Sequence, residues 1–374
     1  MSMPMTAARI QIAATALVAF AFAVIVTRMA PRANGTAELK NPAAAGTLKV
    51  LLAGDVMLGR LVNDVLRERS PAYPWGDTLP LMRSADVRIV NLECVISDKG
   101  RPWTVTPKLF HFRSDAKNAE ALKAAGIDAV SLANNHALDY GYEAMSDMLR
   151  LLGRAGVRHA GAGNNRVEAC KPAIFDVRGV RVGLIAFTDN EPPWEATAAR
   201  AGVCYAPINP ADRRAKEILR TVSEAKAGAD LLIVSAHWGP NWRYRPPPEH
   251  VTFGRLLAEA GADVVFGHSA HVFRGIEIHR GKPILYSAGD FIDDYAVDDV
   301  ERNDESFVFL LDVTAEAVRE ISLYPSLIRH FQARRARDAE ALRISQRMIG
   351  LCSQLGTAAT WLPAEGRIRI TISR

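Results

Sequence analysis

The chain has 374 residues, of which 49% are hydrophobic, 23% are charged and 7% are aromatic, and this composition is ordinary for a globular protein with one large core or two small ones. The formal net charge of +5 and the pI of about 9.1 fit an anionic substrate or a negatively charged membrane surface. No basic stripe interleaved with aromatic residues is visible, which argues against nucleic acid as a partner.

The four cysteines are too far apart in the sequence to form a C-x-x-C pair, which argues against a zinc knuckle and a thioredoxin-like motif. An even number of cysteines permits a disulfide outside the cytoplasm, but scattered cysteines with apolar neighbours are more often buried thiols. We therefore expect buried thiols at Cys94, Cys170, Cys204 and Cys352.

An uncharged, mostly apolar run covers residues 10–27, between Arg9 and the pair Arg28 and Arg32. Its 18 residues are few for a membrane span and many for the core of a signal peptide. Because no clean small-x-small cleavage site follows, we expect residues 1–46 to be an uncleaved signal anchor and linker. A single N-terminal pass would then hold the catalytic domain outside the cytoplasmic membrane, and cleavage would give a secreted form.

After the linker, short apolar runs alternate with amphipathic segments. We expect strands at residues 48–52, 87–92, 127–132, 231–235, 264–266, 276–279, 283–287, 307–313 and 367–372, and a hairpin over 173–187 that turns at Gly179. We expect helices at residues 61–68, 116–125, 142–155, 210–226, 248–261 and 339–355. The alternation predicts an α/β or α+β fold with layered sheets, in one domain over 47–326 and a helix-strand extension over 327–374.

Five of the strand-like runs end in residue types that bind metals. Ligands gather beyond the carboxyl ends of strands in open α/β sheets. A lone aspartate there is usually a turn or helix cap, and a lone histidine is usually structural. The combination is stronger, because four of only nine histidines lie at such places. The residues are Asp55, Glu93, Asn135 with His136, His237, and His268 with His271.

The string from Gly267 to His271 brings two imidazoles, three positions apart, to the end of one strand. Imidazoles suit zinc, iron, manganese or nickel, and the carboxylates of Asp55 and Glu93 add hard oxygen ligands. A mixed set of this kind suits two metals bridged by one carboxylate. Such a pair lowers the pKa of a bridging water and clamps both oxygens of a displacement.

Several longer strings point to one family. GDVMLGR, NLECVIS, LANNHALDYG, HWGPNW, GADVVFGHSAH and GDFIDDY resemble the CapA family, whose members are associated with poly-γ-glutamate capsule synthesis and belong to the calcineurin-like metallophosphoesterase superfamily. The resemblance covers residues 48–325 in the right order. It implies a metallophosphatase-like sandwich of two mixed β-sheets flanked by helices, with two divalent metal ions (Mn, Fe or Zn).

The resemblance also implies roles for single residues. Glu93 takes the position of the bridging aspartate, Asn135 would bind one metal, and His136 would face the substrate as the general acid. The other implied metal ligands are Asp55, His237, His268 and His271. Met57 stands where the first motif has a histidine, and a thioether is a poor ligand for a hard ion. The metal site near Asp55 is therefore expected to be weak, or to fill only with substrate present.

Weaker candidates flank these residues. The stretch after His237 carries Asn241, Arg243 and Arg245, and an arginine there could hold a carboxylate or a phosphate. A solvated loop explains the stretch equally well. Asp139 and Asp290 could orient histidines of the site, or could cap a helix and a turn.

Two classes of function stay open on the sequence. The first is a metal-dependent hydrolase or transferase acting on an anionic cell-envelope compound, either a phosphoester or a poly-γ-glutamate-like chain. The second is a non-catalytic, membrane-tethered accessory protein of capsule polymer assembly or export, working with the capsule synthesis machinery. A nuclease is disfavoured by the expected location and by the lack of a basic binding surface.

Overall fold

The computed structural model describes residues 47–314 and 316–373, which belong to one compact unit. The predicted membrane anchor lies outside the described residues. Within them, no helix has the length and apolar character that crossing a membrane requires.

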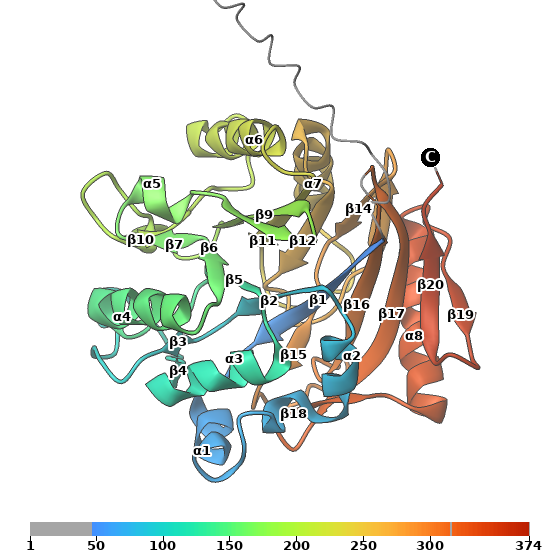
Figure 1. Ribbon diagram of the computed structural model, residues 1–374, viewed down its shortest axis with the longest axis horizontal. Coiled ribbons are helices and arrows are strands. Elements are labelled where there is room, and N and C mark those ends of the chain that lie inside the picture. The colour runs from blue at the N-terminus through green and yellow to red at the C-terminus, as the bar shows by residue number, and fades with distance from the viewer. Residues whose placement is uncertain (1–46, 315, 374) are drawn as a thin grey trace, which may run out of the picture. The chain divides into compact units, whose positions relative to one another are not determined.

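A ten-stranded mixed sheet forms one main layer (Figure 1), in the order β19-β20-β17-β16-β1-β2-β5-β6, with β15 beside β1 and β18 beside β17. Its parallel half and β15 carry the residues that matter below. They are β1 (Leu48–Val56), β2 (Val87–Leu92), β5 (Ala129–Ser131), β6 (Arg158–Ala160) and β15 (Asp290–Ile292). The antiparallel half comprises β16 (Glu305–Val313), β17 (Val318–Arg329), β18 (Gln332–Arg335), β19 (Thr360–Leu362) and β20 (Arg367–Thr371).

A six-stranded sheet forms the second layer, in the order β13-β14-β12-β11-β9-β8. Its central strands run parallel and its two edge strands run antiparallel. The strands are β8 (Ala173–Val177), β9 (Val180–Thr188), β11 (Leu231–His237), β12 (Val264–His268), β13 (Ile276–His279) and β14 (Lys282–Leu285). Two small ribbons pair β3 (Val95–Ile96) with β4 (Arg113–Ser114), and β7 (Ala162–Gly163) with β10 (Gly202–Val203).

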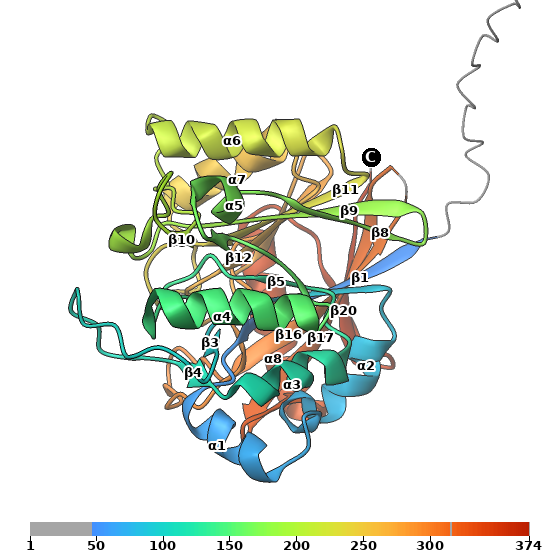
Figure 2. The same cartoon turned by 60° about the vertical axis from the view of Figure 1, so that its left-hand side comes forward.

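Helices cover the outer faces of both sheets (Figures 1 and 2). On the ten-stranded sheet these are α1 (Arg60–Glu68), α2 (Leu79–Arg83), α3 (Ala119–Ala125) and α4 (Gly141–Arg154). On the six-stranded sheet they are α6 (Arg213–Lys226) and α7 (Pro248–Ala260). Helix α8 (Asp338–Gln354) packs into the apolar cluster between the sheets. Short helices are α5 (Arg166–Ala169), η1 (Tyr73–Thr78), η2 (Ala116–Asn118) and η3 (Pro192–Trp194).

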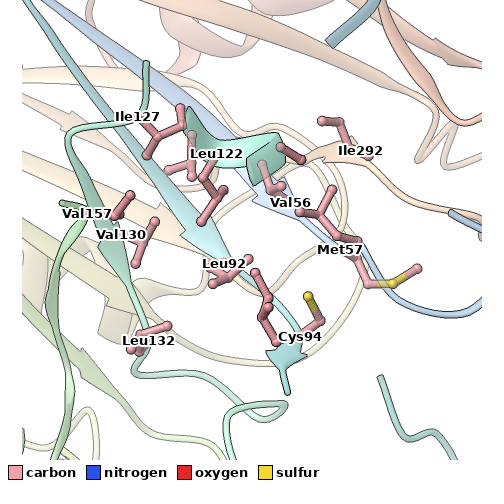
Figure 3. Packing of buried hydrophobic residues seen from close by; sticks show 14 of the residues in the cluster. Val56, Met57, Leu92, Cys94, Leu122, Ile127, Val130, Leu132, Val157 and Ile292 are labelled. Atoms are coloured by element: carbon pink, nitrogen blue, oxygen red, sulfur yellow. The ribbon is translucent and has the colours of Figure 1, made fainter. Parts of the chain in front are cut away.

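Strand β1 shows why the sheets stack. Its Val50 and Leu52 belong to the cluster between the sheets, whereas Leu51 and Ala53 belong to the cluster under the helices. Both faces of the strand are therefore buried, which is why it reads as an unbroken apolar run and not as an alternating one. Figure 3 shows part of the helix-side cluster, where Met57 packs at the end of β1.

The predicted fold class, a sandwich of two mixed β-sheets flanked by helices, is confirmed. The hairpin over 173–187 is also found, with Gly179 at its turn in the left-handed conformation (φ 83°). Strand β17 runs across residue 327, where a helix-strand extension was predicted to begin, and β20 pairs with this strand.

The expectation of four buried thiols is wrong for two cysteines. Cys170 and Cys204 form a disulfide across a sequence separation of 34 residues. The pairing of β7 with β10 brings the two segments together, and the Cα atoms of the cysteines lie 4.9 Å apart. Apolar neighbours could not reveal this contact, because it depends on a long-range strand pairing. Cys94 and Cys352 are buried thiols, as predicted.

Candidate metal centre

Both sheets direct polar side chains to one place. In the ten-stranded sheet, Asp55 near the end of β1 pairs with Asp290 at the start of β15, and Glu93 directly follows β2. In the six-stranded sheet, His237 at the end of β11 pairs with His268 at the end of β12. The parallel strands end at the same edge of the sandwich, which is where ligands collect in α/β folds.

The first group of possible metal ligands contains Asp55, Glu93 and His237, whose ligand atoms lie within 4.8 Å of one another. All three side chains are buried. Asn91 on β2 links the group, because its Nδ2 donates to Asp55 Oδ1 at 2.8 Å and lies 3.3 Å from Glu93 Oε2. Asn134 in turn donates to Asn91 Oδ1 at 3.0 Å, which fixes the orientation of the amide.

The second group contains Asp55, His271 and Asp290, with ligand atoms again within 4.8 Å of one another. His271 Nδ1 lies 2.9 Å from Asp290 Oδ1. Asp290 therefore belongs to a possible ligand group, in addition to the orienting contact with a histidine that the sequence suggested. Among the described residues, Asp55 is the member common to the two groups.

Two further predicted ligands lie beside these groups. Asn135 Oδ1 is 2.9 Å from His237 Nε2. His268 Nδ1 is 3.2 Å from Asp55 Oδ1, and its ring is fully buried. The structure thus brings Asp55, Glu93, Asn135, His237, His268 and His271 together, as the sequence predicted; their roles as ligands stay predictions.

The chemical state of these side chains fits a divalent cation. Among the described residues, Asp55 Oδ2, Glu93 Oε1, Asp290 Oδ2 and His268 Nε2 are buried without a hydrogen-bond partner. Burial, and then the charge of Asp55, raises the pKa values of Glu93 and Asp290 well above their usual range. Buried carboxylates crowded in this way are costly unless a cation compensates them, and mixed oxygen and imidazole donors suit Mn, Fe or Zn.

His136 lies beside the centre and is held from two sides. Its Nδ1 is 2.6 Å from Asp139 Oδ2, and the same oxygen accepts a hydrogen bond from the Phe112 backbone N–H at 2.6 Å. The Phe112 ring stacks on the imidazole with centroids 3.9 Å apart. Lys108 Nζ lies 3.4 Å from the other oxygen of Asp139. Of the two placements that the sequence left open for Asp139, the structure shows the contact with His136.

These contacts also set the protonation of the pair. Burial, and then the charge of Lys108, lowers the pKa of His136 well below its usual range. Burial raises the pKa of Asp139 to about 7, against the opposing charge of Lys108. The imidazole is therefore neutral at neutral pH in the metal-free protein, with Nδ1 directed at Asp139 and Nε2 directed away from it.

A cavity of about 500 Å³ opens over the centre. His271 of the second group lines it, together with Asn135 and His136 beside the groups. Other residues of the lining are Arg60, Lys108, Phe110, Asn241, Trp242 and Tyr295. The predicted substrate residue Asn241 thus faces the cavity. Arg243 and Arg245 are exposed and are not part of its lining, so their role in substrate binding stays a prediction.

One wall of the cavity comes from the connection between β3 and β4, which projects from the sheets in Figure 2. This connection carries Lys108, Phe110 and Phe112. Sequence reasoning missed Lys108 because nothing in a loop of this kind marks a buried lysine. It missed Asn91 and Asn134 because their hydrogen bonds join strands that are distant in the sequence.

Met57 is a buried residue directly after β1. Its Sδ accepts a hydrogen bond from the Gly59 N–H at 3.0 Å, and its side chain is buried in the helix-side cluster (Figure 3). The thioether that replaces the expected histidine is therefore a core residue.

The family described as "Bacterial capsule synthesis protein PGA_cap" matches residues 49–295. The chain belongs to this family. The PGA_cap match takes in every residue of the two ligand groups, together with His136 and Asp139, and it confirms the predicted CapA-like membership.

Individual relatives agree with this assignment. The chain is 37% identical over 285 residues to a "Probable polyglutamine synthesis accessory protein" of Mycobacterium tuberculosis, covering 66% of this chain and 74% of that protein. It is 29% identical over 249 residues to the "Capsule biosynthesis protein CapA" of Bacillus anthracis, covering 66% and 60%. Among solved structures, a phosphatase from Mycoplasma pneumoniae is similar at 14% identity and a TM-score of 0.47, over 75% of this chain and 94% of that one.

Proposed function

We propose that this member of the PGA_cap family is a metal-dependent hydrolase or transferase of the cell envelope. The observation that carries the proposal is a set of buried carboxylates and imidazoles with unpartnered ligand atoms, placed directly beside a cavity that His136 lines. A purely structural polar cluster would satisfy its own hydrogen bonds, whereas Asp55 Oδ2, Glu93 Oε1 and His268 Nε2 have no hydrogen-bond partner among the described residues.

Divalent ions held by Asp55, Glu93, Asn135, His237, His268 and His271 would polarise a phosphoryl or acyl oxygen and lower the pKa of bound water. His136 would move a proton at Nε2, the nitrogen that Asp139 does not occupy. Asp139 fixes the ring orientation and would stabilise the imidazolium once the proton is taken up. Phe112 limits access of water to one face of the ring.

The cavity lining carries both charged and aromatic groups. Arg60 and Lys108 lie in it, Arg60 paired with Asp294 at 3.2 Å and Lys108 paired with Glu191, also in the lining, at 3.3 Å. An anionic substrate would exchange its own charge for one of these carboxylates. Phe110, Trp242 and Tyr295 supply aromatic surface. We propose a phosphoester or a γ-glutamyl amide of an envelope polymer as the substrate class, in keeping with the capsule synthesis family.

Location outside the cytoplasm is part of the proposal. Its support is the apolar run at residues 10–27, together with the Cys170–Cys204 disulfide, since disulfides persist in oxidising compartments. Cell fractionation, followed by protease added to the outer side of intact membranes, would test the location. Full protection of the protein from the protease, inside the cytoplasm, would contradict the proposal.

The second candidate function is an accessory role in polymer assembly, with a metal centre that only stabilises the fold. The thioether of Met57 favours it, because a thioether that accepts a hydrogen bond from Gly59 is a poor ligand for a hard ion and leaves the first motif one ligand short. Under this proposal, metal would raise stability while no substrate would turn over.

The experiment combines metal content with turnover. The purified full-length chain, reconstituted with Mn²⁺, would be assayed on phosphoesters and γ-glutamyl amides beside His136→Ala. The matched control is His279→Ala, which removes a histidine on β13 that pairs with Glu259 on α7. We expect His136→Ala to keep its metal and lose roughly 100-fold or more in turnover, with the control unchanged. Metal binding without turnover of any substrate would favour the accessory role.

A further inference from the structure

We propose that Arg274 is a positioning residue that holds Trp242 in the wall of the cavity, and that Trp242 is the surface on which a ring of the substrate stacks. The inference rests on the proposed hydrolase or transferase function and deepens it, because it assigns a substrate-binding residue outside the metal groups. It concerns the connection between β11 and α7, residues 238–247, in which Arg243 and Arg245 were predicted to contact the substrate.

The backbone of this connection is strained at two consecutive residues. Trp242 and Arg243 have φ angles of 71° and 67°, in the left-handed region that residues with a side chain rarely adopt. Such conformations persist only where surrounding contacts impose them, and they gather at ligand-binding sites. The Trp242 side chain is partly buried and lines the cavity, whereas that of Arg243 is exposed. The strained pair therefore places an aromatic side chain in the cavity wall.

The guanidinium of Arg274, in the segment that follows β12, holds this strained pair. Its Nε donates to the carbonyl oxygen of Arg243 and its Nη2 to that of Trp242, both at 3.0 Å. Because the donors of a planar guanidinium have a fixed spacing, they fix the two carbonyls relative to each other. Arg274 is only 1% exposed, so water does not compete for these bonds, and hydrogen bonds from a charged donor are strong.

The segment after β12 holds the connection at two more points. The Ser269 hydroxyl donates to the Gly239 carbonyl at 2.9 Å. The Trp242 N–H donates to the Ala270 carbonyl at 2.8 Å. His271 of the same segment also lines the cavity, and its ring centroid lies 5.9 Å from that of Trp242. The segment therefore places the indole beside a residue of the second ligand group.

A role for Arg274 in stability alone is the alternative. Burial lowers the pKa of Arg274 to about 10, against the opposing charge of Glu301, so the guanidinium is charged at neutral pH. A buried charge is costly, and Nη1 has no hydrogen-bond partner among the described residues. Since apolar residues often replace buried charged groups without loss of stability, stability gives little reason for an arginine here. Holding two carbonyls of a left-handed pair does give one.

The other residues of the wall indicate what Trp242 would bind. Phe110 and Tyr295 line the same cavity, so the indole is one of several aromatic surfaces near the metal groups. Aromatic side chains bind other rings through stacked or edge-to-face contacts. A substrate with a ring next to the bond that is broken therefore fits this wall better than one with an open alkyl chain.

Limited trypsin digestion of the full-length chain tests the positioning role without measuring activity. The probe is the bond after Arg243, since the bond after Arg245 precedes a proline and resists trypsin. We expect Arg274→Met to be cut there at least about 10-fold faster than wild type, because two hydrogen bonds that close the loop are lost. The matched control is Arg88→Met, which removes a largely buried arginine that donates to backbone carbonyls elsewhere and should leave this cleavage unchanged.

Turnover by the Mn²⁺-reconstituted chain tests the role of Trp242. Benzyl phosphate and hexyl phosphate differ in the ring while their leaving groups have similar basicity, and γ-glutamyl benzylamide and hexylamide form a second such pair. We expect wild type to have the lower KM for the benzyl compound. Trp242→Ala and Arg274→Met should each raise that KM by about 10-fold with little change in kcat, whereas Trp242→Phe should keep the preference.

Each contrary result has a separate meaning. Cleavage of Arg274→Met at the wild-type rate would overturn the role of Arg274. An equal preference in wild type and Trp242→Ala would overturn the role of Trp242. If circular dichroism shows that Arg274→Met is unfolded, Arg274→Lys replaces it, because lysine keeps the charge but cannot bridge two carbonyls. Cleavage at least about 3-fold faster is then expected, and an unchanged rate overturns the inference.

Failure of the proposed function gives a different result. If wild type turns over none of these compounds and no other phosphoester or γ-glutamyl amide, the enzymatic function is overturned, and the substrate-binding role of Trp242 with it. The trypsin digestion still decides whether Arg274 holds the connection, because that measurement needs no substrate.

Discussion

The ten-stranded and the six-stranded sheets meet at one edge of the sandwich, yet the side chains they bring there differ in kind. The ten-stranded sheet and its loops supply oxygen donors, namely Asp55, Glu93, Asn135 and Asp290. The six-stranded sheet supplies imidazoles, namely His237, His268 and His271. The ten-stranded sheet brings carboxylates that repel one another, and the six-stranded sheet brings imidazoles without a carboxylate, so neither set is a complete metal site. The centre exists only where the two sheets pack together.

Asp55→Asn should have the largest effect on the metal centre to which both sheets contribute. The substitution removes the charge common to both donor groups, so we expect metal affinity to fall by more than about 100-fold at both positions. The metal-free variant should be more stable than metal-free wild type, because the charge of Asp55 that acts on Glu93 and Asp290 is gone. Titration calorimetry and thermal unfolding with and without Mn²⁺ measure the two effects.

The control for this variant is Asn91→Ala, which removes an amide that contacts the same carboxylate without removing a charge. A smaller loss of affinity, of about 10-fold, is expected there. Tight binding of two ions by Asp55→Asn would show that the two sheets do not share this residue as a ligand.

The side chains of the two sheets should contribute differently to the pH dependence of metal binding. Burial lowers the pKa of His237 to about 3, so this imidazole has no proton to lose near neutral pH. Glu93 and Asp290 have raised pKa values and must release protons when an ion binds. Metal affinity should therefore rise with pH, with the released protons coming from the ten-stranded sheet.

Without metal, the stability of the folded protein should change with pH in the direction opposite to that of metal affinity. A carboxyl group whose pKa is raised by folding stabilises the folded state below its unfolded pKa, and this contribution is lost as pH rises toward the folded pKa.

The release of protons on metal binding is measured by calorimetry in two buffers of different ionisation enthalpy, at about pH 6 and about pH 8. Binding without proton release, or with affinity independent of pH, would contradict the assignment.

A smaller effect, on stability alone, is expected from the disulfide. Replacing Cys170 and Cys204 by serine should lower the free energy of unfolding by about 3–4 kcal/mol, as for a closed loop of this size, while both ions stay bound. Thermal unfolding and metal analysis test this, and the untreated wild-type chain should show free thiols only at Cys94 and Cys352. Four reactive thiols in unreduced, denatured protein would contradict it.

The smallest effect should follow from Met57→His. Because Met57 points into the helix-side core, the new imidazole would be buried among apolar groups, at a cost of about 1–3 kcal/mol, with no gain in Mn²⁺ affinity. Met57→Leu is the matched control and should cost less than about 1.5 kcal/mol. A tighter second ion in Met57→His would show that the first motif still accepts a histidine ligand.

Much of this arrangement follows from local sequence signals. The strand predicted at 87–92 is β2 without change, and the helix predicted at 248–261 is α7 within one residue, because buried strands and amphipathic helices have a clear periodicity. The convergence of acids and histidines at strand ends was also predictable. The local pattern did not predict β15, because its three residues are too few to show a periodicity.

The missed features share a physical cause, since each depends on contacts between segments far apart in the chain. The sequence left Asp290 either to orient a histidine or to cap a turn, and only the pairing of β15 with β1 brings it to Asp55. Asn91 looked like part of an apolar strand, and its hydrogen bonds reach β1 and the loop after β5. No window along the sequence contains these pairs.

Gly54 affects how the phenotypes of sequence variants at this site should be interpreted. The residue binds nothing, yet any side chain there would meet the Gly289 carbonyl oxygen and push β15 away from β1. In a saturation library, position 54 should therefore be as intolerant of change as the ligands, and even alanine should behave like a loss of metal. An inactive variant at a backbone position would then be mistaken for a catalytic one unless its metal content were measured.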